Sequence, residues 1–153
     1  MNVDGDIVKV KLYDTAGEET TLPTQTTFSI EKSLYKQSNG IILIFDITKR
    51  ESFDKLEAWI KDIEDKVEEH TIKTLIGNKI DLEGRTATID EMNEFAKKHS
   101  FDYYETSAKE NKDVNTIFSD IIKKTYLKVK SLKPRESFQL MNKSQIKTAG
   151  CCT

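Results

Sequence analysis

The segment Asp14–Glu19, with the sequence DTAGEE, combines residue types that can hold magnesium and phosphate. It follows an alternating apolar run over residues 7–13, which predicts a strand that ends at Asp14. A carboxylate is thereby placed where the strand opens into a loop, and the backbone of Gly17 is open to close approach by a ligand. The same residue types also form ordinary turns, so the segment alone leaves both interpretations open.

Two further polar segments follow predicted strands later in the chain. Gly77–Leu82, with the sequence GNKIDL, comes after the apolar run of residues 72–76, and Glu105–Lys109, with the sequence ETSAK, comes after residues 101–104. Strands that alternate with capped helices predict an α/β fold with a mostly parallel sheet, in which ligands bind outside the carboxyl ends of the strands. All three polar segments lie at such ends, where a ligand is expected.

Together these segments resemble the DTAGQE, NKxD and SAK motifs of Ras-like small GTPases, in the order and spacing of that family. Residues 40–53, with the sequence GIILIFDITKRESF, resemble the fourth strand and the entry to the third helix of Rab proteins. The chain is therefore identified as a member of the Rab-type small GTPases in the Ras superfamily. The resemblance implies a P-loop NTPase-like, three-layer α/β fold with a mostly parallel sheet, and GTP or GDP with Mg²⁺ as cofactors.

The resemblance implies that the first segment serves the phosphate end of the nucleotide. Asp14 would reach Mg²⁺, and the N–H of Gly17 would meet the γ-phosphate. Glu18 stands at the catalytic position, where the family has a glutamine that orients water. This departure puts hydrolysis in doubt, because a carboxylate adds negative charge beside the γ-phosphate.

The other two segments are implied to recognise the base. Guanine presents N1–H and N2–H₂ as adjacent donors, and the Asp81 carboxylate can accept both, a pair of contacts that adenine cannot make. Asp81 is thus the expected selectivity residue, and Ser107 is implied to steady its loop.

Four more contacts to the base follow from the same resemblance. Asn78 is implied to bond the base and to tether the neighbouring loops. The stems of Lys79 and Lys109 would pack over the two faces of the base, while the N–H of Ala108 would meet the guanine oxygen.

The beginning of the family's fold has no counterpart in these 153 residues, which contain no GxxxxGK[ST] pattern. The resemblance therefore describes a fold that lacks the first strand, the P-loop, the first helix and the switch I segment. In the family that strand lies between the strands that here end at Asp14 and Asp46, so we expect a gap in the sheet. The strands could close up, a partner could fill the gap, or the sequence could be an incomplete copy of a longer protein.

Turn and capping residues predict the remaining elements. Asp4 and Gly5 indicate a two-residue hairpin turn between residues 1–3 and 7–13. Thr48 and Thr88, each with a Glu three residues later, predict capping boxes at the starts of two helices. The capping box at Thr48 and an apolar stripe over residues 53–67 predict a helix of about five turns. Further stripes predict helices over residues 89–96 and 114–125.

Composition predicts one cytosolic domain followed by a basic tail. The chain is 37% hydrophobic, and no apolar run approaches the length of a membrane-spanning helix. The net charge is −2, yet residues 123–153 hold eight Lys or Arg and one acidic residue. We therefore expect a small GTPase-like domain over residues 1–130 and a flexible basic tail over residues 131–153.

The two cysteines of the chain, Cys151 and Cys152, lie next to its last residue. The ending resembles the CCX ending of Rab proteins, which implies that both cysteines are prenylated and anchor the chain to a membrane. The further partners implied are effector, exchange-factor and escort proteins, with no nucleic acid. The implied location is the cytosolic face of intracellular membranes, in exchange with the cytosol.

Two functional hypotheses from different classes remain open. The first is a Rab-like small GTPase that binds GTP, hydrolyses it slowly and acts as a switch in intracellular vesicle traffic. The second is a lipid-anchored interaction module that keeps the guanine-binding loops but does not hydrolyse GTP. The missing P-loop favours this second hypothesis. An oxidoreductase with a Rossmann fold is disfavoured, because no GxGxxG segment follows any predicted strand.

Overall fold

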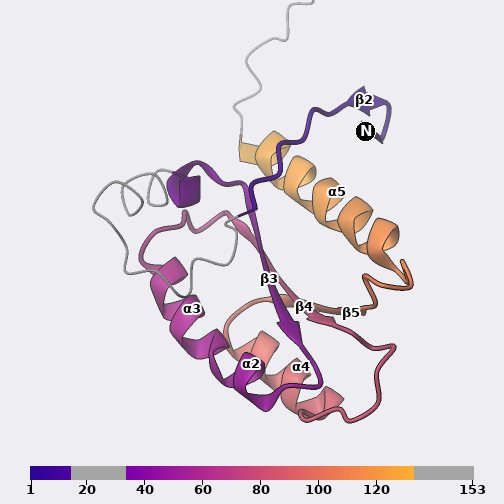
Figure 1. The fold of residues 1–153 in the computed structure, drawn as a ribbon. Helices are drawn as coiled ribbons and strands as arrows, with labels where there is room; N and C mark the ends of the chain where they lie inside the picture. The colour runs from indigo at the N-terminus through magenta and orange to yellow at the C-terminus, as the bar shows by residue number, and fades with distance from the viewer. Residues whose placement is uncertain (15–33, 133–153) are drawn as a thin grey trace, which may run out of the picture.

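Residues 1–14 and 34–132 are described in the computed structural model of the chain. Its centre is a parallel sheet in the order β3-β4-β5, shown in Figure 1. The strands are β3 (Gly40–Asp46), β4 (Ile72–Asn78) and β5 (Asp102–Thr106). Their register aligns Asp46 with Asn78 and Asn78 with Thr106, so the three carboxyl ends meet at one edge of the sheet. The mostly parallel α/β fold expected from the sequence is confirmed.

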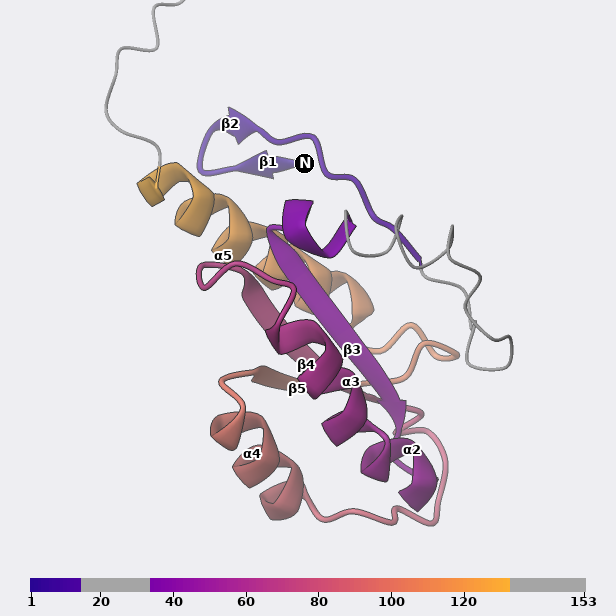
Figure 2. The same cartoon turned by 90° about the vertical axis from the view of Figure 1, so that its left-hand side faces the viewer.

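Helices cover both faces of this sheet, as Figures 1 and 2 show. Three of them pack on one face and α5 packs on the other. They are α2 (Arg50–Asp54), α3 (Leu56–Glu64), α4 (Ile89–Lys98) and α5 (Val114–Leu132). The end of α5 lies just beyond residue 130, where the sequence predicts the tail to begin, and that domain boundary stays a prediction. No helix among the described residues is long and apolar enough to cross a membrane.

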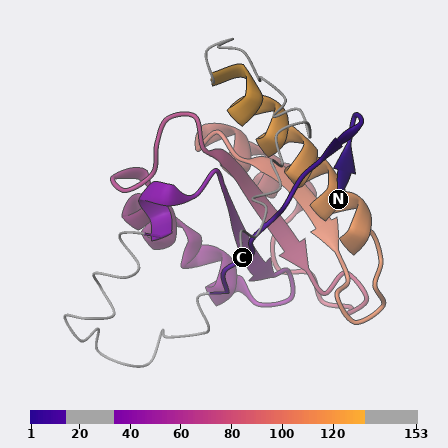
Figure 3. The ribbon, with the colours of Figure 1, turned by 90° about the horizontal axis from the view of Figure 1, so that it is seen from above.

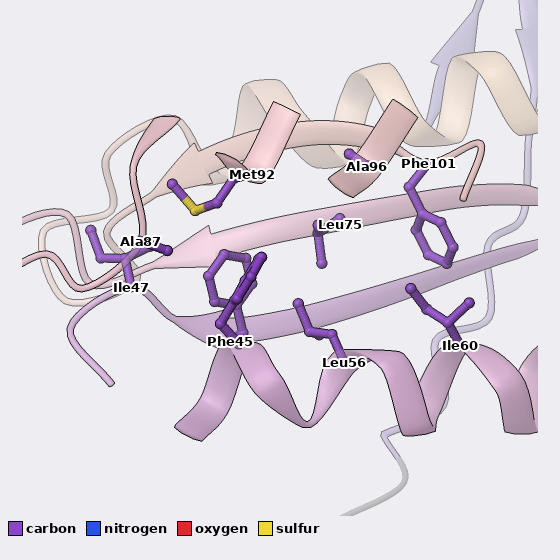
Figure 4. Packing of buried hydrophobic residues seen from close by; sticks show 10 residues of the cluster. Phe45, Ile47, Leu56, Ile60, Leu75, Ala87, Met92, Ala96 and Phe101 are labelled. Carbon is purple, nitrogen blue, oxygen red and sulfur yellow. The ribbon is translucent and has the colours of Figure 1, made fainter. Parts of the chain in front are cut away.

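The main hydrophobic core fills the space between the sheet and the three helices of the first face. Figure 4 shows its side chains pointing toward one another from β3, β4, α3 and α4. Phe45 packs tilted against Phe53, with ring centroids 5.6 Å apart. A smaller cluster of Ile76, Ile117 and Ile121 packs α5 on the opposite face. Each predicted helical stripe therefore contributes residues to a core that positions the carboxyl edge of the sheet.

The two predicted capping boxes differ in outcome. Thr88 caps α4 as expected, because its hydroxyl accepts a hydrogen bond of 3.1 Å from the N–H of Glu91. The capping box predicted at Thr48 is wrong: α2 begins after Lys49, which makes no side-chain cap. The Thr48 hydroxyl instead donates to Asp46 Oδ1 at 2.6 Å. A nearby carboxylate at the strand end thus replaces the helix N-terminus as its partner.

The predicted five-turn helix after residue 50 is divided into α2 and α3 at Lys55. The backbone of Lys55 keeps right-handed helical angles, and its N–H still donates to the carbonyl of Glu51 at 3.1 Å. The two helices therefore form a nearly continuous rod. Leu56, Ile60 and Ile63 face the core from its second part.

The predicted hairpin forms, but it is much shorter than the sequence suggests. Strands β1 (Asn2–Val3) and β2 (Asp6–Ile7) pair across a turn in which Asp4 and Gly5 have φ angles of 50° and 93°. These positive angles suit a type I′ turn, in which Gly is favoured.

The strand predicted over residues 7–13 is wrong beyond Ile7. Residues 8–14 form no strand in the structure, and the side chains of Leu12 and Tyr13 are 70% and 63% exposed. Within the described residues no strand pairs with the outer edge of β3, and the hairpin forms a sheet of its own. An alternating sequence becomes a strand only where a neighbouring strand pairs with its backbone, and within residues 1–14 and 34–132 no strand pairs with residues 8–14.

The hairpin rests against α5 through charged side chains, and Figure 3 shows the two lying side by side. Lys130 Nζ contacts Asp6 Oδ2 at 2.8 Å, and Lys123 Nζ contacts Asp4 Oδ1 at 3.3 Å. The Tyr126 hydroxyl also donates to Asp6. These groups are half or more exposed, so each ion pair contributes little to stability.

Candidate functional site

The carboxyl ends of β3, β4 and β5 bring together most of the described residues that the sequence predicts for a nucleotide site. Asn78 ends β4, and Ser107 directly follows β5. Asp14 lies on the exposed segment that leads away from the hairpin. The other predicted positions, Gly17, Glu18, Cys151 and Cys152, lie outside the described residues.

Asn78 joins the two loops that are predicted to hold the base. Its side-chain oxygen accepts hydrogen bonds from the N–H of Lys79 at 2.8 Å and from the N–H of Ala108 at 3.0 Å. One amide oxygen thereby fixes the start of its own loop and the loop after β5. This geometry agrees with the tethering role that the sequence resemblance implies for Asn78.

Asp81 is held in place by Ser107. The Ser107 hydroxyl donates to Asp81 Oδ1 at 2.6 Å and accepts a hydrogen bond from the N–H of Glu110 at 3.1 Å. Only 4% of the Asp81 side chain is exposed, and Lys109 Nζ lies 3.8 Å from its second oxygen. The hydrogen bond from Ser107 lowers the pKa of Asp81, against the opposing effect of burial. Asp81 is therefore an ionised acceptor at neutral pH.

Asp46 also lies at this edge of the sheet, although the sequence did not predict it as a residue of the site. Lys79 has a φ angle of 72°, and its ammonium group lies 2.7 Å from Asp46 Oδ2. Burial raises the pKa of Asp46, but the hydrogen bonds from Lys79 and Thr48 outweigh it and lower that pKa to about 2. The available signal was its position, since Asp46 ends an apolar strand at the same edge as Asn78.

A glycine allows the strands to pack closely behind the site. A Cβ atom on Gly77 would lie 2.8 Å from Ile47 Cγ2 and 2.8 Å from the hydroxyl oxygen of Tyr103. Real Cβ atoms do not approach other atoms this closely, so Gly77 is required directly before Asn78. The loop that carries Asp81 thus begins from a tightly packed point in the core.

The donor and acceptor pattern of the site fits a guanine base. The ionised Asp81 carboxylate offers acceptors for two adjacent N–H donors, and Ser107 fixes its orientation. The Ala108 N–H is already bonded to Asn78, so a guanine oxygen would share this donor. The Asp14 carboxylate is the kind of ligand that Mg²⁺ uses, because the ion binds through one or two carboxylates together with phosphate oxygens. No cluster of three or more metal-ligating side chains occurs within residues 1–14 and 34–132.

Comparisons with known proteins identify the family of the chain. The family model described as Ras family matches residues 1–127. Ras-related protein Rab-10 of Caenorhabditis elegans is 31% identical over 157 residues, which cover 99% of this chain and 75% of that protein. Ras-related protein Rab-18 of Lymnaea stagnalis is 35% identical over 125 residues, or 81% of this chain and 59% of that protein.

Human Ras-related protein Rab-30 is 38% identical over 122 residues, which cover 79% of this chain and 57% of that protein. The matches to Rab-18 and Rab-30 span less than two thirds of those relatives. The shared region nevertheless includes nearly the whole of the sheet, its helices and the polar edge described above. The chain therefore belongs to the Ras family, as a small GTPase of the Rab type.

Proposed function

We propose that this chain binds guanine nucleotides at the carboxyl edge of its sheet and acts as a Rab-like switch in intracellular vesicle traffic. The observation that carries the proposal is the Asp81 carboxylate, which is ionised, oriented by Ser107 and joined to the next loop through Asn78. Such a group favours a base with two adjacent donors, and guanine is the nucleobase that presents N1–H beside N2–H₂.

The neighbouring residues take complementary roles in this proposal. Asp81 accepts both donors of the base, and the N–H of Ala108 meets its oxygen. The stems of Lys79 and Lys109 cover its faces, because lysine stems are apolar while their ammonium groups stay polar. Lys109 is suited to this role, since its side chain is 79% exposed beside Asp81.

The phosphate end of the nucleotide is assigned to the DTAGEE segment. Asp14 would hold Mg²⁺ together with phosphate oxygens, and the N–H of Gly17 would bind the γ-phosphate. With Glu18 in place of glutamine, we expect GTP hydrolysis to be slow. With a P-loop segment grafted onto the N-terminus, single-turnover measurements that compare Glu18 with Glu18→Gln test this expectation. Equal rates would show that Glu18 does not slow hydrolysis.

Membrane attachment is assigned to the end of the chain. Prenyl groups on Cys151 and Cys152 would supply two lipid anchors, which give stable binding where a single chain gives marginal binding. Effector, exchange-factor and escort proteins are the implied partners of such a cycle. After expression in cells, the wild type should sediment with membranes and the Cys151→Ser/Cys152→Ser variant should stay soluble. A variant that still sediments without aggregating would contradict the lipid anchor.

A second candidate is a lipid-anchored interaction module without turnover. The residue at the catalytic position favours it, because Glu18 stands where the family has a glutamine that orients water. Both candidates predict guanine recognition by the same edge. They differ in hydrolysis, which only the first requires, so a GTP turnover assay separates them.

The substitution Asp81→Asn tests the proposed base contact. An amide presents one acceptor oxygen where the carboxylate presents two, so the variant should lose its preference for GDP over ADP. The measurement is a pair of titrations with each nucleotide, and Asp54→Asn on the exposed side of α2 is the matched control. Retention of the full preference by Asp81→Asn would contradict the proposed role of Asp81.

A further inference from the structure

Strand β5 holds the loop of residues 79–86 at two points along one face. Tyr103 and Glu105 are alternate residues of β5, so their side chains lie on the same side of the strand, and Ser107 directly follows the strand. Ser107 donates to Asp81 at 2.6 Å. Two residues earlier, the Glu105 carboxylate binds Arg85, which is four residues beyond Asp81. Glu105 of β5 and Ser107 directly after it therefore bind the loop at Arg85 and at Asp81.

The contact between Arg85 and Glu105 is a two-point ion pair. Arg85 Nη1 lies 2.7 Å from Glu105 Oε1, and Nη2 lies 2.8 Å from Oε2. The two side chains are only 30% and 24% exposed. A guanidinium and a carboxylate joined by two parallel hydrogen bonds have a fixed relative orientation, which single surface contacts lack.

Glu105 is itself supported from within the core. The Tyr103 hydroxyl donates to Glu105 Oε1 at 2.7 Å and contacts Met92 Sδ at 3.0 Å. Burial, followed by the neighbouring Glu105 carboxylate, raises the pKa of Tyr103, so the hydroxyl stays a donor. The Glu105 carboxylate is thus a fixed point to which the Arg85 side chain is attached.

Little else holds the middle of this loop. Residues 82–84 and Thr86 are exposed, and a Cβ atom on Gly84 would meet nothing within 4 Å. The N–H of Leu82 bonds to the carbonyl of Lys79 within the loop at 3.0 Å, and the N–H of Thr86 bonds to the carbonyl of Ile47 at 2.9 Å. The pair with Glu105 therefore fixes a stretch that has almost no packing of its own.

We propose that Arg85 and Glu105 are positioning residues for base recognition, whose ion pair holds the Asp81 carboxylate where it meets the 2-amino group of guanine. The inference rests on the proposed nucleotide site and deepens it. It assigns part of the preference for guanine to two residues that do not touch the base. Without the ion pair the loop should move. The hydrogen bond from the 2-amino group of guanine to Asp81 should then weaken more than the hydrogen bond from N1–H.

Binding of GDP and inosine diphosphate to Arg85→Ala tests the role of the pair. Inosine lacks the 2-amino group, so the ratio of the two affinities reports on the placement of Asp81, whereas general destabilisation lowers both affinities equally. We expect GDP affinity to fall about three- to tenfold and the preference for GDP to fall with it. Arg85→Lys keeps the charge without the two-point geometry and should lie between wild type and Arg85→Ala.

The matched control is Arg50→Ala, which removes an arginine that is also paired with two carboxylate oxygens. Arg50 contacts Asp54 at 2.9 Å and Glu91 at 2.7 Å, and neither partner belongs to the loop of residues 79–86. This variant should keep the wild-type preference for GDP. An equal loss of GDP and inosine diphosphate affinity in Arg85→Ala, or no loss of either, would overturn the inference.

Amide hydrogen exchange gives a second readout that needs no nucleotide. In Arg85→Ala, exchange at the N–H groups of Leu82 and Ala108 should be faster by about fivefold or more, because both groups belong to the loops that the pair connects. Unchanged exchange at both would overturn the inference even in a chain that binds no nucleotide. Failure of the wild type to bind GDP would instead contradict the proposed function.

Discussion

The carboxylate of Asp46 carries more contacts than its place in the sequence suggests. One oxygen accepts hydrogen bonds from the N–H and the hydroxyl of Thr48, and the other pairs with the ammonium group of Lys79. The side chain is only 11% exposed. A single residue thus connects the end of β3 to the loop that carries the predicted base contacts.

The pKa of Asp46 makes its contribution to stability depend on pH. The folded pKa of about 2 lies below the ordinary value of 3.8, so the contribution is complete above about pH 4 and is lost as the pH falls toward 2. We expect Asp46→Asn to lower the free energy of unfolding by about 1–2 kcal/mol at pH 7 and by progressively less below pH 4. Urea unfolding at several pH values measures this difference.

The control for this prediction is Asp54→Asn. Asp54 also forms an ion pair, with Arg50 at 2.9 Å, but its side chain is 57% exposed. Its replacement should change the free energy of unfolding by less than about 0.5 kcal/mol. If Asp46→Asn destabilised the protein equally at pH 7 and pH 2.5, ionisation of Asp46 would not be the cause.

Residues of the site differ in how far the sequence reveals them. Asn78, Asp81 and Ser107 could be predicted, because each lies in a short motif directly after an apolar run. Asp46 and the pair of Arg85 with Glu105 could not, because their contacts depend on how separate loops meet in space. The partner of Glu105 lies twenty positions away, and no periodic pattern connects the two residues.

At the scale of elements, local hydrogen bonds decide where the helices begin. Thr88 and Thr48 have the same pattern in sequence, with a Glu three residues later. The Thr88 hydroxyl accepts a hydrogen bond from the N–H of Glu91 and thereby caps α4. Thr48 follows Asp46 by two residues and donates to that carboxylate instead. Sequence patterns therefore predicted a helical segment after each threonine but only one of the two caps.

This difference predicts the effect of removing the cap of α4. Thr88→Ala leaves the N–H of Glu91 without its acceptor and should lower the free energy of unfolding by about 1 kcal/mol. Thr88→Ser keeps the hydroxyl and serves as the control, with a much smaller expected loss. Chemical denaturation of both variants measures the effect, and equal losses would show that the methyl group of Thr88, and not its hydroxyl, stabilises α4.

At the scale of the whole molecule, the sheet ends at β3 within the described part of the chain. Ile44 on this strand is 58% exposed, although the strand reads as a continuous apolar run. Apolar runs predicted β4 and β5, and apolar stripes predicted the helices. The family resemblance predicted β3 and the helical layers on both faces. The prediction failed for residues 8–13, since alternation records only that a strand could form and not whether a neighbour is available.

The open edge of β3 gives a prediction for hydrogen exchange. Alternate N–H groups of a strand point to opposite sides, so within residues 41–45 only those directed at β4 should be protected. Residues 9–13 should exchange rapidly. In β4, which lies between β3 and β5, the N–H groups that point to either neighbouring strand should be protected. Exchange measured by NMR tests this pattern. Uniform protection of residues 41–45 in a monomer would show that the edge is covered.

A direct titration tests whether this chain selects guanine over adenine. The purified chain is titrated with GTP, GDP and ATP in the presence of Mg²⁺. We expect binding of GTP and GDP in the micromolar range or weaker, because the 153 residues contain no GxxxxGK[ST] segment to cradle the phosphates, and much weaker binding of ATP. Equal affinity for ATP and GTP would contradict the assignment of Asp81, and nanomolar affinity for GTP would contradict the weak phosphate site.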